Sequence, residues 1–171
     1  LRDTDASRAL WPHAFELELD VLVGKELSLV LTTRNTGKTP LTYNAALHTY
    51  LQISAPEAVS VTGLGEPYAD KLTGQDGQQQ GALTLIAAID RVYHQADAMV
   101  MVKEGDRTTK VVSGNHDSVV VWNPWAEGAT AMADMSDDGY RTMLCVEAAI
   151  TADAGITVAP DEEHSFSTVI I

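Results

Sequence analysis

The strongest constraint on the fold is a period-two alternation of apolar and acidic residues near the start of the chain. Over residues 15–21 (FELELDV), four apolar side chains alternate with three acidic ones. Successive side chains of a strand point to opposite faces, so this spacing predicts a strand with one apolar and one acidic face. A similar alternation over 27–32 follows the turn residues 23–26, which predicts a β-hairpin over 14–33.

Further strand candidates follow at similar spacing along the chain. They cover residues 45–54, 57–62, 83–87, 98–103, 108–113, 118–122, 128–134, 142–150 and 165–171. Only residues 3–11 have helical character, and the polar, glycine-bearing stretch 73–81 is typical of a surface loop. Many short strands without amphipathic helices predict an all-β fold, an antiparallel β-sandwich. With 171 residues and no linker-like shift in composition, we expect a single domain over 1–171.

The charge balance restricts the partners of this chain. It has 24 acidic and 11 basic side chains, a formal net charge of −13. An acidic surface opposes phosphate backbones and anionic lipid headgroups, so we expect neither nucleic acid nor a membrane surface as a partner. No segment has the composition of a signal peptide or a membrane span. The single cysteine, Cys145, excludes an internal disulfide and fits a reducing, cytoplasmic location.

The common motifs of metal and nucleotide enzymes are not found in the sequence. None of the five histidines has the His-x-His or His-x-x-x-His spacing of a zinc site, so we expect no metal. There is neither a glycine-rich phosphate loop nor a Gly-x-Ser-x-Gly nucleophile motif. The sequence therefore does not support a hydrolase or a nucleotide enzyme of a familiar kind.

Two ionisable residues stand out because their neighbours are apolar. His48 lies in the uncharged stretch AALHTYL, and Glu147 lies in the apolar stretch MLCVEAAI. Burial raises the pKa of a carboxyl group and lowers that of an imidazole, which suits both groups to proton transfer near neutral pH. The alternative is that His48 is a hydrogen-bonded core histidine and that Glu147 faces solvent.

Two further patterns have ordinary structural interpretations. Trp122 and Trp125 in the stretch VVVWNPW are suited to stacking on a sugar, but paired tryptophans also pack in or beside a core. Asp90 and Arg91 place opposite charges side by side, and the simplest interpretation is a surface ion pair.

Five segments together resemble one known family. They are ALHTY (46–50), GLGEPYADK (63–71), DRVY (90–93), VVVWNPW (119–125) and MADMSDDGYRTMLCVE (132–147). In this order they resemble the hexose-6-phosphate mutarotases, the glucose-6-phosphate 1-epimerases of the aldose 1-epimerase superfamily. The resemblance implies a galactose mutarotase-like β-sandwich. By the same resemblance, we expect this chain to lack the family's N-terminal portion. It also implies catalysis without a metal or an organic cofactor.

The resemblance assigns roles to three residues. It places the catalytic histidine on His48, the catalytic glutamate on Glu147, and a sugar-contacting aspartate on Asp90. Mutarotation opens a pyranose by removing a proton from the anomeric hydroxyl and adding one to the ring oxygen. Glu147 would act as the base and His48 as the acid, from opposite sides of the sugar, and the roles would reverse on closure. Asp90 would hold a sugar hydroxyl and fix the pose.

The expected function is therefore interconversion of the α and β anomers at C1 of an aldohexose, with glucose 6-phosphate as the first candidate and a hexose as the other. In the family an arginine-bearing N-terminal segment contacts the phosphate, and the basic residues of this chain form no comparable cluster. We expect weak phosphate recognition, and self-association through exposed sheet edges. The alternatives are a non-catalytic carbohydrate-binding β-sandwich and a structural remnant that acts only in association.

Overall fold

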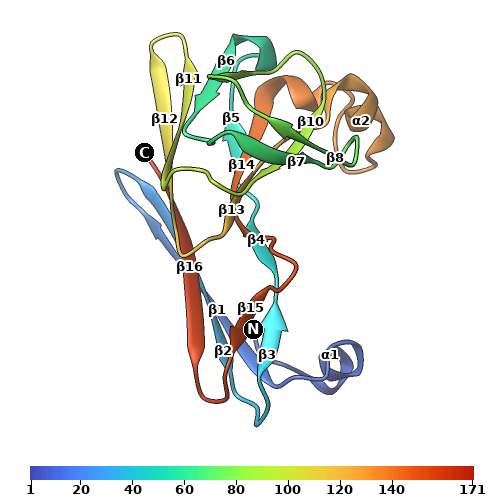
Figure 1. The fold of residues 1–171 in the computed structure, drawn as a ribbon, viewed down its shortest axis with the longest axis vertical. Helices are drawn as coiled ribbons and strands as arrows, with labels where there is room; N and C mark the ends of the chain where they lie inside the picture. The colour runs from blue at the N-terminus through green and yellow to red at the C-terminus, as the bar shows by residue number, and fades with distance from the viewer.

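The computed structural model describes residues 1–171 and consists mainly of two seven-stranded antiparallel sheets (Figure 1). This architecture confirms the predicted all-β antiparallel fold. The strands of the first sheet, in spatial order, are β1 (Phe15–Val23), β2 (Leu27–Asn35), β16 (Glu163–Ile170), β12 (Arg107–Gly114), β11 (Met99–Glu104), β6 (Val59–Thr62) and β9 (Leu83–Thr84).

The second sheet carries most of the residues discussed below. Its strands, in order, are β4 (Ala45–Leu47), β14 (Met143–Ile150), β13 (Ser118–Asn123), β10 (Ile89–Tyr93), β7 (Pro67–Asp70) and β8 (Gln75–Gln78), with β5 (Tyr50–Gln52) also pairing with β14. A separate two-stranded sheet joins β3 (Leu41–Tyr43) to β15 (Ile156–Val158). The helical elements are α1 (Asp5–Leu10), α2 (Trp125–Ala131) and the 3-10 turns η1 (Pro56–Ala58) and η2 (Gly139–Thr142).

The main core lies between the two large sheets. Most of its 16 buried residues come from strands of both sheets, among them Val100 of β11, Val121 of β13 and Leu144 of β14. Strand β14 is buried along its whole length, with all eight of its residues buried. Leu144 and Val146 point into the main core. Cys145 and Glu147, which alternate with them along the strand, therefore point to the opposite face of the sheet.

The predicted hairpin over 14–33 is present as β1 and β2, joined by a three-residue turn at 24–26. On its acidic face, Arg34 of β2 lies 2.6 Å from Glu18 of β1. Strand β1 is also the outer edge of the first sheet, and its apolar side chains Leu19 and Val21 are 53% and 54% exposed. The hairpin therefore has an acidic face and an apolar face, and the apolar face is partly uncovered at the edge strand β1.

Several element predictions were wrong. Residues 128–134 do not form a strand but overlap α2, where alanines favour helix and the hydroxyl of Thr130 donates to the carbonyl of Ala126. The predicted surface loop 73–81 contains the exposed strand β8, which pairs with β7. The predicted strand 45–54 is interrupted after residue 47 and resumes at residue 50. Strands β3, β7, β10 and β15 were not predicted.

Both α-helices are short, at six and seven residues. Neither has the length and apolar character needed to cross a membrane.

Candidate active site

The carboxyl group of Glu147 is buried although its strand could have presented it to solvent. Only 4% of the residue is exposed. Burial is the main cause that raises its pKa to about 7, and the negative charge of Asp90 raises it further, while Lys71 lowers it. The suggestion that Glu147 faces solvent is therefore wrong, and the expected rise of its pKa is present.

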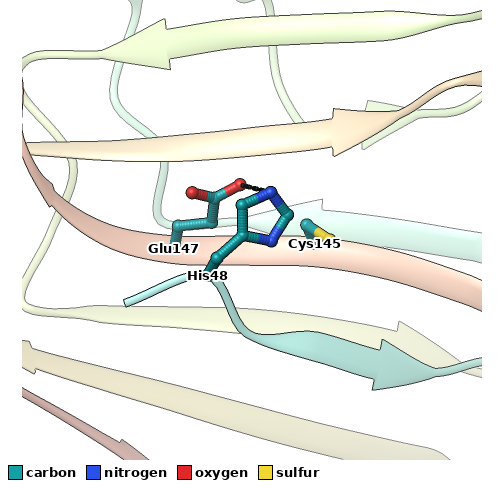
Figure 2. Close-up of side chains that lie close together, drawn as sticks. All are labelled: His48, Cys145 and Glu147. Atoms are coloured by element: carbon teal, nitrogen blue, oxygen red, sulfur yellow. Dashed lines mark ion pairs between the residues drawn. The ribbon is translucent and has the colours of Figure 1, made fainter. Parts of the chain in front are cut away.

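His48 reaches Glu147 because the second sheet is interrupted at this point. Leu47, the last residue of β4, pairs with Ala148 of β14, so the next residue falls beside Glu147. The Nε2 atom of His48 lies 3.3 Å from Oε1 of Glu147 (Figure 2). The ring stacks on Tyr50 with centroids 4.9 Å apart. The His48 side chain is 48% exposed, so the expectation of a buried histidine, and with it the core-histidine alternative, is wrong.

Asp90 lies on β10, two strands away from Glu147, and lines the same pocket. Burial raises the pKa of its carboxyl group, and the nearby charges of Lys71 and His48 oppose this rise. The predicted ion pair with Arg91 is not formed, because adjacent residues of a strand point to opposite faces. Arg91 instead pairs with Asp70, with 3.2 Å between Nε and Oδ2.

The structure thus brings His48, Glu147 and Asp90 together in one pocket of about 460 Å³. This volume lies within the range of small-molecule sites, about 300–1,000 Å³. The other lining residues come from the segments around these three. They are Asn44, Ala45, Ala46, Lys71, Val120, Trp122, Ile150 and Thr151.

Lys71 is a pocket residue that the sequence did not single out. It is the only lysine or arginine among the lining residues. It follows β7 directly, and its backbone N–H donates to the carbonyl of Asp90 at 2.8 Å. An exposed lysine at the end of a strand carries no local signal of function. Lys71 is nevertheless the last residue of the GLGEPYADK segment.

Two glycines of the same segment explain how the chain reaches β7. Gly63 and Gly65 have φ angles of +86° and +74°. A Cβ atom on Gly63 would lie 2.5 Å from the carbonyl oxygen of Met99, and one on Gly65 would lie 2.4 Å from that of Gln95. Only glycine accommodates both the backbone conformation and this close approach. These turns lead into β7 and so place Lys71 beside Asp90.

The two tryptophans of the VVVWNPW segment have different surroundings. Trp122 lines the pocket and meets the His48 ring edge-on, with centroids 5.8 Å apart. Trp125 packs against the main core and lies 5.5 Å from the ring of Tyr140. Asn123 between them is fully buried, and its amide donates to the carbonyls of Tyr140 and Met143. Sugar stacking is thus open to Trp122, whereas Trp125 is a packing residue.

A second hollow, of about 470 Å³, lies between the hairpin and β3. It is lined mainly by apolar side chains such as Trp11, Phe15 and Leu31. It contains no carboxylate and no histidine. Of these two hollows, the pocket of His48 and Glu147 is therefore the one with side chains suited to acid–base chemistry.

Comparison with known proteins agrees with this geometry. Residues 1–170 match the sequence profile of the aldose 1-epimerase family. The chain belongs to the aldose 1-epimerase family. The predicted resemblance is therefore confirmed at the level of the family.

Individual relatives support this assignment. The chain is 36% identical over 172 residues to a candidate glucose-6-phosphate 1-epimerase of Cenchrus ciliaris, covering 95% of this chain and 52% of that one. It is similar to the crystal structure of a candidate mutarotase, YeaD, of Salmonella typhimurium, with a TM-score of 0.91 and 32% identity over 99% of this chain and 57% of that one. A galactose mutarotase related enzyme of Lactobacillus acidophilus shares the fold, with a TM-score of 0.76 and 12% identity over 100% of this chain and 66% of that one. The chain spans about half the length of the curated relatives it matches.

Proposed function

We propose that this pocket interconverts the α and β anomers of an aldohexose at C1, and that glucose 6-phosphate is its first candidate substrate. The observation that carries the proposal is the contact of 3.3 Å between His48 Nε2 and Glu147 Oε1 inside a sugar-sized pocket. The glucose-6-phosphate 1-epimerase name of the relatives supports the choice of substrate.

The contact suits the chemistry of ring opening. The two oxygens that exchange protons, the anomeric hydroxyl and the ring oxygen, are both bonded to C1. An acid and a base that lie next to each other can therefore reach both oxygens. The sequence had suggested groups on opposite sides of the sugar. His48 and Glu147 lie side by side, because β14 and the break between β4 and β5 are neighbours in the sheet.

In the proposed reaction, Glu147 removes the proton of the anomeric hydroxyl while His48 donates a proton to the ring oxygen. The bond between C1 and the ring oxygen breaks, and C1 becomes an aldehyde carbon. Rotation about C1–C2 presents the other face of the aldehyde, and the same two groups reverse their roles to close the ring. A base with a pKa of about 7 is well matched to this exchange at neutral pH.

Asp90 and Lys71 would hold the sugar in place. A carboxylate accepts hydrogen bonds from hydroxyl groups, and an ammonium group donates to hydroxyl or phosphate oxygens. Phosphate recognition commonly involves several arginine or lysine contacts, whereas this pocket contains one lysine. We therefore expect this chain to distinguish glucose from glucose 6-phosphate only weakly.

Polarimetry on freshly dissolved α-glucose and α-glucose 6-phosphate tests the proposal. We expect both sugars to lose optical rotation faster than in buffer, with values of kcat/KM that differ by less than about tenfold, or about 1.4 kcal/mol. A larger preference for the phosphate ester would show that the chain contains a phosphate site beyond Lys71. Binding of either sugar with no acceleration would refute the proposal and favour the non-catalytic carbohydrate-binding alternative.

A further inference from the structure

Cys145 has no part in the proposed reaction, yet its thiol lies beside the acid–base pair. It is two residues before Glu147 on β14, and both side chains point to the same face of the sheet. One donor atom each of His48, Cys145 and Glu147 lies within 4.8 Å of the other two (Figure 2). We propose that these three residues form a Zn²⁺ site and that the ion inhibits the enzyme when it binds there.

The donor set selects the class of metal. A thiolate sulfur, an imidazole nitrogen and a carboxylate oxygen are the three ligand types that zinc takes in proteins. Calcium and magnesium prefer sites made only of oxygen atoms. A borderline-soft divalent cation therefore fits this cluster, and Zn²⁺ is the common member of that class.

The geometry needs only a small adjustment. Ligand bonds of about 2.0–2.3 Å around a tetrahedral zinc ion place the donor atoms about 3.3–3.8 Å from one another. His48 and Glu147 are already 3.3 Å apart. Cys145 and Glu147 are held by the pairing of β14 with β13, whereas His48 lies between two three-residue strands and is half-exposed. His48 is therefore the ligand that can move to complete the site with the fully buried Cys145.

Charge favours a cation at this position. The carboxyl groups of Glu147 and Asp90 face the pocket, where Lys71 is the only fixed positive charge, and the chain as a whole carries −13. The Cys145 thiol must lose its proton to bind a metal, because the thiolate is the ligand. Binding then forms a zinc–sulfur bond and releases the thiol proton to solvent.

Occupation of the site would block the reaction. The ion would take the lone pairs with which His48 and Glu147 accept protons, so neither group could exchange one with a sugar. Three protein ligands would leave a fourth position for water or a sugar hydroxyl. The inhibition rests on the proposed function, whereas the binding of the metal does not.

Cobalt provides a direct test, because Co²⁺ replaces zinc and its bond to a thiolate absorbs in the near ultraviolet. Cys145 is the only cysteine, so such a band can arise only from this residue. We expect the band on adding Co²⁺ to the chain at neutral pH, and its loss when Zn²⁺ is added. The matched control is His94→Gln, which changes an exposed histidine outside the pocket and should keep the band.

Two variants and a measurement of proton release test the proposal further. Cys145→Ala should abolish the band, and the half-exposed His48→Ala should weaken Zn²⁺ binding at least tenfold in calorimetry. Calorimetry of the unaltered chain in two buffers of different ionisation enthalpy should also show that zinc binding releases protons. Bound Co²⁺ without a thiolate band, or Zn²⁺ binding unaffected by Cys145→Ala, would overturn the site.

The activity measurement separates this proposal from the proposed function. Zn²⁺ should slow anomer exchange by the parental chain, and Cys145→Ala should retain exchange while requiring at least tenfold more Zn²⁺ for the same inhibition. A chain that forms the thiolate–cobalt band but never catalyses exchange would support the metal site and refute the epimerase. A chain that catalyses exchange but shows no such band would support the epimerase and refute the metal site.

Discussion

The Nε2 atom of His48 lies 3.3 Å from the Oε1 atom of Glu147, although the two residues are 99 positions apart in the sequence. The register of β4 against β14 produces this contact, because Leu47 pairs with Ala148 and the strand then breaks at His48. A half-exposed imidazole thus meets a buried carboxyl group at the wall of a pocket. The predictions below depend on this contact and on the charges around it.

Glu147→Gln should make the fold more stable at alkaline pH than the parental chain is. The pKa of Glu147 is raised from its ordinary value of 4.5 to about 7, so the folded state favours the protonated form. The stability that this preference contributes is fully present below pH 4.5 and is lost as the pH rises through about 7. The amide remains neutral throughout. Urea unfolding at pH 5 and pH 8 should show a gap in unfolding free energy that grows with pH, to at most about 3 kcal/mol. An equal gap at both pH values would contradict the raised pKa.

His48→Asn should reduce activity without unfolding the chain. A positioned acid contributes about 10²- to 10⁴-fold to a rate, whereas the loss of a half-exposed side chain costs little stability, about 1 kcal/mol or less. Anomer exchange kinetics and thermal unfolding measure the two effects. The control is His94→Asn, at an exposed histidine outside the pocket, which should change neither. A His48 variant that loses stability and activity in parallel would support a structural role instead.

The acid side of the pH–rate profile should follow Glu147 and respond to its charged neighbours. In the parental chain kcat/KM should fall below a midpoint of about pH 7 as Glu147 takes up a proton. Asp90→Asn removes a charge that raises this pKa, so the midpoint should move to lower pH. Lys71→Met removes a charge that lowers it, so the midpoint should move to higher pH.

The profiles of these variants are compared with that of Lys103→Met, which changes an exposed lysine on β11 of the other sheet. This control should leave the midpoint unchanged. Shifts of Asp90→Asn and Lys71→Met in the same direction would show that electrostatics at Glu147 does not govern the acid side.

The uncovered edge of the first sheet predicts self-association. The outer strand β1 exposes more than half of Leu19 and Val21, and exposed edge strands pair readily with other chains. Sedimentation velocity should show an average mass that rises with protein concentration. The double variant Leu19→Glu, Val21→Lys should remain monomeric, whereas Leu10→Glu, at a 90% exposed leucine of α1, should not change the association. A monomeric parental chain at all concentrations would refute this prediction.

The sequence predicted the fold where one face of a strand is apolar and the other polar, as in β1 and β2. It failed where local pattern and tertiary environment disagree. Asp90 and Arg91 break the alternation of β10, because the first lines a pocket and the second pairs with Asp70 on β7. The alanine-rich sequence of α2 is compatible with a helix or a strand. The turn at Asn123 and Pro124, where the backbone N–H of Trp125 donates to the Asn123 side chain, begins the helix.

The site was predictable to the extent that its residues contrast with their neighbours or belong to family segments. His48, Glu147 and Asp90 met these conditions, and the structure places them in one pocket. Lys71 and Cys145 also lie in such segments, but the resemblance assigned a role to neither, and an exposed lysine and a buried cysteine are ordinary in strands. Their relation to Glu147 depends on strand pairing and on which face of the sheet each side chain occupies. Sequence spacing does not encode either property directly.

The most direct test of the account is exchange spectroscopy by NMR on an equilibrium mixture of α- and β-glucose 6-phosphate. The measurement reports the rate of anomer interconversion itself, with no net conversion and no coupling enzyme. The parental chain should speed exchange above the buffer rate, and Glu147→Gln should reduce the protein-dependent rate by at least about 100-fold while remaining folded. Equal exchange rates with the parental chain and with Glu147→Gln would contradict the assignment of Glu147 as the base.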